Sequence, residues 1–396
     1  MNAVDSSRSR TVERATQPSP DLQTLESHIR TLVTLDETDA PVLSCYLNLE
    51  TRHEWRPMFD SRVRVLRQTI RRGEDEPFER ALTRVEGFLE SALVLASKGA
   101  AVFARSGSQP FFLPLQFQVP LPNHVAVDST PNIYHLVELK DTYHRYIVMI
   151  STEEHARILE VNLGAMTRQL WSERPELHER VGREWTREHY QSHRRSRADR
   201  FIKEKVQVLE RLMTGGGHTH LILAGSPHLT ARVRNALPAH LATKLIDIVP
   251  ATAQARTSDV VAATLASFVE QEERESIDAV ALLVREVRRH GLAVVGTRPS
   301  LEALLRGQVD MLLIAGAYEP PPGWSCRGCG HVDARIEAPA RCRTCGRAEL
   351  HGVNLKETMV RLAERSGCRI EIVGHSDVLM ALGGVGCLLR YLTPEP

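Results

Sequence analysis

Two pairs of cysteines constrain this chain more than any other feature. They lie in the segments Cys326-Arg-Gly-Cys329 and Cys342-Arg-Thr-Cys345, with twelve residues between the pairs. Each CxxC pair places two thiolates on one tight turn, and two such turns complete the tetrahedral sulfur cage that zinc prefers. Nearby glycines allow the positive φ angles that these turns need: Gly328, Gly330 and Gly346. A redox pair or chance clustering is the alternative. Four thiolates leave no open position, so we expect one structural zinc ion, not a catalytic one.

The composition is that of an ordinary globular protein of two to four domains. The chain has 396 residues and a formal net charge of +1, so no global basic excess indicates nucleic-acid binding. Three further cysteines lie in apolar runs and are expected to be buried free thiols: Cys45, Cys368 and Cys387. An odd cysteine count beside a zinc site favours a reducing, cytoplasmic location. No apolar run is long enough for a transmembrane helix, and the polar N-terminus does not resemble a secretory signal.

Turn formers and alternating helical and strand-like runs divide the chain into a tail and three α/β segments. Residues 1–20 are expected to be a disordered tail. Residues 21–138 predict an N-terminal α/β domain. Residues 139–256 alternate helices with apolar strands, which is typical of a Rossmann-like central domain. Residues 257–396 predict an α/β/α sandwich that carries the zinc ribbon as an insert at 320–352.

Each segment has its own predicted elements. The first has helices at 22–35, 61–72 and 77–97, strands at 41–50, 100–104 and 111–119, and a turn-rich end at 120–132. The second has a hairpin of strands 146–151 and 156–161, a helix that ends at Leu212 before the stop at 213–217, and a strand at 220–226. The third has helices near 257–274, 276–289, 299–306, 355–366 and 376–382, and strands at 292–296, 309–315, 368–373 and 386–391.

The order of these elements resembles the archaeo-eukaryotic class-1 peptide chain release factors and their Pelota relatives, in the bacterial branch of that superfamily. The third segment carries most of the resemblance, through LEALLRGQVDMLLIAG, the two cysteine turns, LKETMVRLAERSGCRIEIVG and ALGGVGCLLRY. THLILAGSPHLTARV and YIVMISTEEHARILEV resemble the strand-turn-helix and the opening hairpin of the family's central domain. The first segment matches least, through YLNLE and SRVRVLRQTI.

The resemblance implies a position for a release loop, but this chain lacks the required residues. Release factors hydrolyse peptidyl-tRNA with a Gly-Gly-Gln loop, in which the glycines give an unusual backbone and the glutamine helps to place water. The matching stretch is EHYQSHRRSRADRF, where Gln191 aligns with the glutamine. His189 and Tyr190 then take the glycine positions, and both resist positive φ angles. Gln191 is therefore a poor catalytic candidate. The alternative is that Gln191 is an exposed polar residue of a loop at 186–196. The triple glycine 215–217 is expected to stop a helix instead.

The codon-reading motif of the family is changed as well. Its Asn-Ile-Lys-Ser sequence lies just before a helix, and here the equivalent stretch is Met58-Phe59-Asp60-Ser61. Asp60 takes the lysine position, where a carboxylate would repel RNA phosphates. Stop-codon recognition by this route is therefore not expected. A few residues of this helix remain candidate ribosome contacts, or else form an ordinary solvated face: Ser61, Arg62, Arg64 and Arg67.

A basic stretch in the second segment is the remaining candidate RNA interface. Seven cations lie within nineteen residues: Arg187, Arg194, Arg195, Arg197, Arg200, Lys203 and Lys205. Two aromatic side chains could stack with bases there, Trp185 and Tyr190, and His189 and His193 lie among the cations. Acidic residues dilute the patch, so a salt-bridged helix face is the alternative: Glu179, Glu184, Glu188, Asp199 and Glu204. His218 and His220 are expected to be structural, and no phosphate-binding loop, HExxH or GxSxG motif is present.

Three functions follow as hypotheses. The first is a monomeric, ribosome-binding factor that occupies the A site without peptide release, near the peptidyl transferase centre, in hibernation or on stalled ribosomes. The Balon-type hibernation factors of the superfamily have such a role. The second is a peptidyl-tRNA hydrolase that uses Gln191 or another group. The third is an RNA-binding ribbon protein unrelated to ribosomes. The resemblance also implies, as a candidate partner of the C-terminal domain, a translational GTPase such as elongation factor Tu.

Overall fold

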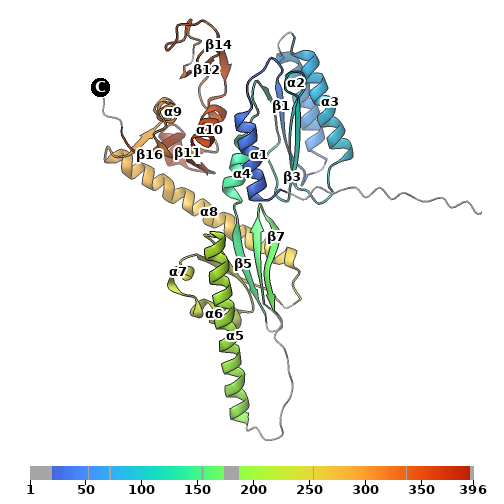
Figure 1. Ribbon diagram of the computed structural model, residues 1–396, viewed down its shortest axis with the longest axis vertical. Coiled ribbons are helices and arrows are strands. Elements are labelled where there is room, and N and C mark those ends of the chain that lie inside the picture. Colours follow the sequence, from blue (N-terminus) through green and yellow to red (C-terminus); the bar gives the residue numbers. More distant parts are fainter. Residues whose placement is uncertain are drawn as a thin grey trace, which may run out of the picture.

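A computed structural model describes residues 20–51, 53–70, 73–152, 156–173, 187–252, 254–335 and 337–392, without the side chains of Thr167, 171–173 and 187–201. The tail expected at 1–20 lies outside these residues except for Pro20. Within this part of the chain, no helix combines the length and the apolar character that crossing a membrane would require. The described residues form four sheets, and Figure 1 shows the long helix α8 (Thr257–Arg288) crossing the middle of the molecule.

The first sheet is antiparallel and covered on both faces. Its strand order is β3-β2-β1-β4. The strands are β1 (Val42–Asn48), β2 (Gly99–Arg105), β3 (Phe111–Phe117) and β4 (His124–Asp128). Helices α2 (Trp55–Thr69) and α3 (Asp75–Ser91) pack on one face, and α1 (Leu22–Thr34) and α4 (Tyr134–Thr142) lie against the other. Because both faces are covered, almost the whole of β1 is buried.

Three predictions for this segment need correction. Helix α2 begins at Trp55, six residues before the expected start, because Phe59 continues the apolar stripe of Val63 and Leu66. Helix α3 ends at Ser91, before the expected 97. The turn-rich stretch 120–132 contains strand β4, which pairs with β1. The sequence pattern did not indicate this strand, because the strand is short and is flanked by turn residues.

The second sheet is mixed and has helices on both faces. Its order is β7-β6-β5-β8-β9, in which β5, β8 and β9 are parallel and β6 and β7 are antiparallel to their neighbours. The strands are β5 (Tyr146–Ser151), β6 (Ala156–Asn162), β7 (Ala165–Glu173), β8 (Leu221–Gly225) and β9 (Leu245–Pro250). One face packs against α5 (Arg187–Gly216), α6 (Pro227–Ala236) and α7 (Ala239–Ala242), and the other against the first half of α8 (Thr257–Arg288). The predicted hairpin is confirmed, whereas the helix expected to end at Leu212 continues to Gly216, within the triple glycine.

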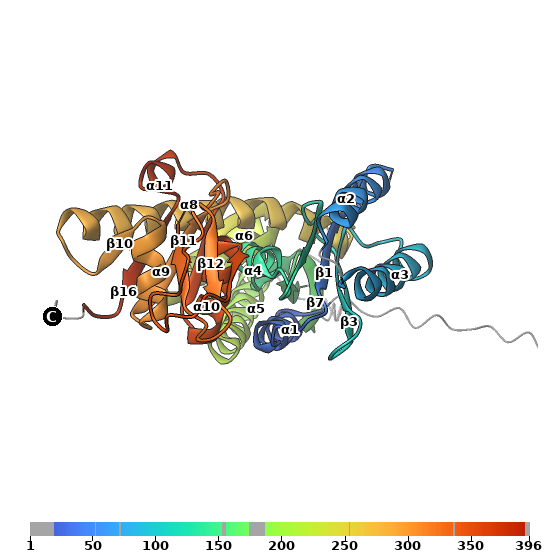
Figure 2. The same cartoon turned by 90° about the horizontal axis from the view of Figure 1, so that it is seen from above.

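The third sheet forms the centre of an α/β/α sandwich. Its order is β10-β16-β11-β15, and only β11 and β15 are parallel. The strands are β10 (Ala293–Val295), β11 (Val309–Ala315), β15 (Arg369–Val373) and β16 (Val385–Leu389). Figure 2 shows α8 and α11 (Asp377–Ala381) on one side, and α9 (Thr297–Leu305) and α10 (Leu355–Ser366) on the other. The three-stranded sheet of the cysteine segment, β12 (Gly323–Cys326), β13 (Val332–Ala334) and β14 (Leu350–Val353), is inserted between β11 and α10.

Helix α8 is shared by the second and third sheets. The two helices expected at 257–274 and 276–289 form one continuous helix instead. Near its first half, Phe268 stacks on Tyr146 of β5 with ring centroids 4.4 Å apart. In its second half, Val280 and Leu283 belong to the core of the sandwich. Residues 270–276 contain no glycine or proline, so nothing in the backbone interrupts the helix where the buried face changes partner.

Helix α10 joins the first segment to the third. Arg361 donates hydrogen bonds to the carbonyl oxygens of Leu32, Val33 and Pro131, at 3.1, 2.9 and 2.7 Å. Glu357 lies one turn earlier on α10, and its carboxylate reaches the backbone at the start of α4. These contacts place backbone groups of the first segment directly against α10, so the two segments share one continuous apolar core.

Candidate metal centre and nucleic-acid interface

The four predicted cysteine ligands meet in one cluster. Their sulfur atoms all lie within 4.8 Å of one another. Cys326 Sγ lies 3.5 Å from Cys345 Sγ, and Cys329 Sγ lies 3.6 Å from Cys342 Sγ. A disulfide would need about 2.05 Å. A tetrahedral zinc site with Zn–S bonds of about 2.3 Å sets its sulfurs roughly 3.8 Å apart. The spacing therefore fits a zinc cage, and the thiols are free.

The two cysteine turns repeat one backbone pattern. Gly330 N–H donates to the Cys326 carbonyl at 2.8 Å, and Gly346 N–H donates to the Cys342 carbonyl at 2.9 Å. Both glycines have positive φ angles, +70° and +73°, as expected. Gly328 is different, because its φ is not positive and a Cβ there would come within 2.5 Å of the Arg347 side chain. The repeat aims both cysteine pairs at one point, which is what a four-thiolate site requires.

Helix α5 explains why the basic stretch projects from the molecule. From Ile202 onward its buried residues follow a helical stripe that packs on the second sheet, with Val206, Leu209 and Met213. Between 187 and 200 the sequence contains no isoleucine, leucine, valine, methionine or phenylalanine. This half of the helix has no apolar face with which to pack. Figure 1 shows it extending beyond the rest of the molecule at the lower end of the longest axis.

Gln191 lies in the first turns of α5 and not in a loop. The expected loop at 186–196 is thus wrong for residues 187–196, which are helical. Arginine, glutamate and glutamine are good helix formers, and no glycine or proline occurs between 187 and 212. His189 and Tyr190 are helical as well, so the unusual backbone of a Gly-Gly-Gln loop is not formed there.

The predicted cations of this stretch divide into two groups. Their shared backbone helix places five arginines on the projecting half, although their side chains lie outside the described residues: Arg187, Arg194, Arg195, Arg197 and Arg200. The side chains of Tyr190, His189 and His193 also lie outside the described part of the structure. Trp185 lies outside it with both its backbone and its side chain. Lys203 is exposed. Lys205 is buried on the packing side, and its Nζ lies 3.5 Å from Ser151 Oγ, so it does not belong to an exposed patch.

The candidate contacts of the first segment lie inside helix α2. The loop expected just before a helix at 58–61 is wrong, because Phe59 is a fully buried core residue of that helix. Ser61, Arg62 and Arg64 are exposed, although Arg62 Nε donates to the Val125 carbonyl at 3.0 Å. Arg67 forms a two-point ion pair with Glu79, at 2.7 and 2.8 Å. Arg67 is thus held by an ion pair, whereas Arg62 and Arg64 each donate to a backbone carbonyl.

The two histidines beside strand β8 have different surroundings. His218 is buried, and its Nε2 lies 2.9 Å from Glu160 Oε2. His220 instead meets His144 and Glu272, a group that could hold a metal ion. No short sequence motif indicates this group, because its members are far apart in the chain.

Comparison with known proteins places the middle of the chain in a family. Residues 131–269 match the sequence model of bacterial archaeo-eukaryotic release factor family 10. The superfamily predicted from the sequence is thereby confirmed. The matching part of the chain runs from α4 into α8, with α5 between them. No curated protein matches the chain.

Several solved structures are similar to this chain. The C-terminal domain of a peptide chain release factor from Methanosarcina mazei has 23% identity, covers 36% of this chain and 99% of its own, and has a TM-score of 0.28. Archaeoglobus fulgidus Pelota has 12% identity, covers 94% of both chains and has a TM-score of 0.36. A model of ribosome-bound archaeal Pelota and ABCE1 has 13% identity, covers 94% of this chain and 96% of that chain, and has a TM-score of 0.42.

Proposed function

We propose that this protein is a cytoplasmic, ribosome-binding translation factor that occupies the A site without releasing the peptide. The observation that carries the proposal is the match of residues 131–269 to a bacterial release factor family. The projecting element of the matched part is α5, whose outer half is basic and has no apolar face. Hibernation or engagement of stalled ribosomes is the role we infer.

The charge of the projecting half of α5 suits ribosomal RNA. Five arginines there stand against two acids, Glu188 and Asp199. Arginine pairs with phosphate oxygens through two parallel N–H groups, and Tyr190 adds an aromatic ring that can stack on an unpaired base. A helix without an apolar stripe gains little by packing on its own protein, so a polyanionic partner would use the surface that folding leaves free.

The shape of the molecule supports binding at two places. Figure 1 places α2 near the upper end of the longest axis and the outer half of α5 at the lower end. An A-site ligand of this shape could set Arg62 and Arg64 near the decoding region and the α5 tip near the peptidyl transferase centre. The cysteine cage would hold one structural zinc ion, and the sandwich that carries it is the surface we propose for a translational GTPase.

The absence of a glycine-containing turn at 187–196 supports binding without hydrolysis. Peptidyl-tRNA hydrolysis requires a water molecule held at the ester carbonyl with a geometry close to that of attack. Gln191 on a regular helix has no such backbone to place it. Hydrolysis by this or another group is the rival function, favoured by the release-factor family match alone.

Sedimentation with purified 70S ribosomes tests the proposal. The variant R194E/R195E/R197E should bind more than tenfold more weakly than the wild type, at roughly 1 kcal/mol for each lost phosphate contact. Wild-type binding should also weaken steeply with salt, because phosphate contacts release counterions. The control R298E/R306E/R341E makes the same charge change at exposed arginines of the third segment and should bind normally. Equal binding by both variants at every salt concentration would contradict the proposed interface.

The same assay separates the two roles. A hibernation factor should bind vacant ribosomes as well as ribosomes that carry mRNA. A factor for stalled ribosomes should prefer complexes that carry mRNA and peptidyl-tRNA. Failure of the wild-type protein to sediment with either form would remove the ribosome-binding function itself.

A further inference from the structure

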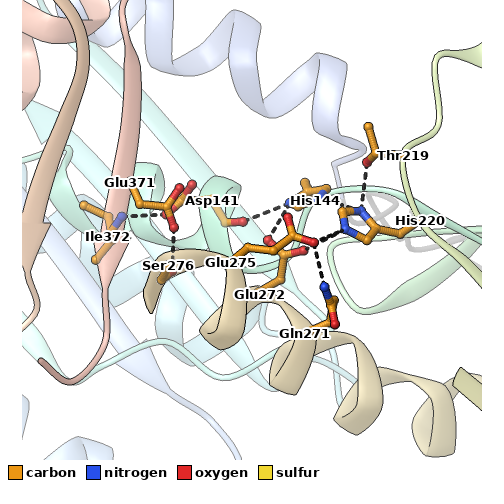
Figure 3. A network of polar contacts seen from close by, with 10 residues as sticks. All are labelled: Asp141, His144, Thr219, His220, Gln271, Glu272, Glu275, Ser276, Glu371 and Ile372. Carbon is orange, nitrogen blue, oxygen red and sulfur yellow. Dashed lines mark hydrogen bonds and ion pairs between the residues drawn. The ribbon is translucent and has the colours of Figure 1, made fainter. Parts of the chain in front are cut away.

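A second cluster of metal-binding residue types lies where helix α8 passes from the second sheet to the third. Figure 3 shows its members coming from three places in the fold. His144 follows α4, His220 precedes β8, and Glu272 and Glu275 lie one turn apart on α8. One ligand atom from each of His144, His220 and Glu272 lies within 4.8 Å of the others.

Glu272 faces both imidazole rings. Its Oε2 lies 3.3 Å from His144 Nδ1, and its Oε1 lies 3.7 Å from His220 Nε2. Glu275 Oε1 lies 2.8 Å from the same His220 Nε2. Zinc bonds of about 2.1 Å to nitrogen and oxygen put neighbouring ligand atoms roughly 3.4 Å apart in a tetrahedral site. His144, His220 and Glu272 therefore converge at close to metal-ligand spacing, and Glu275 lies beside His220.

The outer contacts hold these groups in place. Thr219 Oγ1 lies 2.8 Å from His220 Nδ1, and Gln271 Nε2 donates to Glu275 Oε1 at 2.9 Å. A partner on one ring nitrogen fixes the tautomer and leaves the other nitrogen free to bind a metal. His144 Nδ1 donates to the Asp141 carbonyl at 3.1 Å, so its Nε2, which lies 3.4 Å from His220 Nδ1, is the nitrogen left to bind a metal.

The cluster has more negative than positive groups. The carboxylates of Glu272 and Glu275 both lie beside the imidazole rings. Within the described part of the chain, buried Glu272 Oε1 has no hydrogen-bond donor. The ion pairs of Glu272 there are with histidines, not with lysine or arginine. A doubly charged cation would balance these carboxylates without a proton.

We propose that His144, His220 and Glu272 bind one divalent transition-metal ion of the zinc type, with Glu275 as the fourth ligand. Imidazole with carboxylate is a ligand set for zinc and its neighbours in the first transition row, whereas magnesium and calcium prefer oxygen ligands alone. The ion would tie α8 to the start of β8 and to the end of α4. It would thus fix the second sheet against the helix that also supports the third.

Metal binding by the full-length chain tests this site, with the cysteine cage as an internal reference. The metal-free protein is loaded with Co²⁺, and an organomercurial reagent then displaces metal from thiolates only. The wild type should bind two ions per chain, one of which survives the reagent and lacks a thiolate charge-transfer band. The variant H220Q should bind only the ion with that band. Retention of this thiolate-bound ion shows that the variant has folded.

The matched control is H218Q, which changes a buried histidine two residues away that pairs with Glu160. This variant should keep both ions. E272Q should lose the same ion as H220Q. The proposal is overturned if the wild type binds a single ion that the thiol reagent removes, because the cluster is then a hydrogen-bonded network alone. It is also overturned if H220Q and E272Q both keep two ions. Neither result depends on whether the protein binds ribosomes.

Discussion

Glu357 is a buried carboxylate on which the contact between the first and third segments depends. Its Oε2 accepts hydrogen bonds from the backbone N–H groups of Ile133 and Tyr134, at 2.8 and 3.2 Å. These N–H groups lie at the start of α4, where a helix leaves its backbone donors without partners. Glu357 therefore caps a helix of a different segment.

Burial raises the pKa of Glu357 to about 7 from the ordinary 4.5. The folded protein thus keeps this proton at pH values where the unfolded chain has released it. The stabilising contribution is complete below pH 4.5 and is lost as the pH rises through about 7. E357Q stays neutral, and its amide oxygen can accept both hydrogen bonds. Between pH 4.5 and 8 the wild type should lose up to about 3 kcal/mol more unfolding free energy than E357Q. Denaturant titrations at several pH values that give parallel curves would contradict this assignment.

Cys342 is a buried member of the cysteine cage, and its replacement tests the zinc site. C342S should release the thiolate-bound metal ion and unfold the segment 320–352 locally, because β12, β13 and β14 form a small sheet of their own. The sandwich should keep its fold, since its core does not depend on the metal. Metal content and proteolysis within 320–352 are the measurements. The metal affinity of the wild type should decrease as the pH is lowered, because the thiolates take up protons. Less than one thiol-bound zinc per freshly purified wild-type chain would remove the site.

Helix α8 couples two sheets through one backbone, so breaking it should uncouple them. Ile277 is 57% exposed and lies between Phe268, which packs on the second sheet, and Val280, which packs on the third. I277P should lower the free energy of unfolding by about 3 kcal/mol or more, because proline removes a helical hydrogen bond and clashes with the carbonyl four residues earlier.

The control I277A keeps the backbone and should cost less than about 1 kcal/mol, because the side chain it shortens is exposed. I277P is also expected to unfold in two steps where the wild type unfolds in one. A single transition for I277P with the stability of I277A would mean that α8 does not transmit stability between the sheets. Circular dichroism during denaturant unfolding measures both quantities.

Elements with strong local patterns were predictable from the sequence, and those that depend on distant partners were not. Strands β5, β8 and β11 are apolar runs between turn residues, and their predicted bounds hold within a residue or two. Strand β4 is only five residues long, is flanked by turn residues and is stabilised by pairing with β1. The cysteine cluster was predictable because each pair lies on one turn. His144 and Glu272 meet only after folding, so no spacing in the sequence indicates their site.

The whole molecule combines a release-factor-like middle with surfaces at both ends of its long axis. Helix α5 extends one end, and α2 lies near the other, on a sheet that is fixed to α10 by Arg361. The second and third sheets are in turn held by α8. A ligand built in this way can reach two distant sites as one body. We propose that such a ligand binds the ribosome without the chemistry of peptide release.

Absence of that chemistry is the last prediction, and it concerns peptide release. Ribosomes with a stop codon in the A site and labelled peptidyl-tRNA in the P site should show no faster release with this protein than without it. The reason is that Gln191 lies on a regular helix, and Asp60 lies within α2, not on a codon-reading loop. Q191A should bind ribosomes as the wild type does, since it removes no charge. Rapid, codon-dependent release by the wild type that Q191A abolishes would make the protein an enzyme, and would require the start of α5 to unwind on the ribosome.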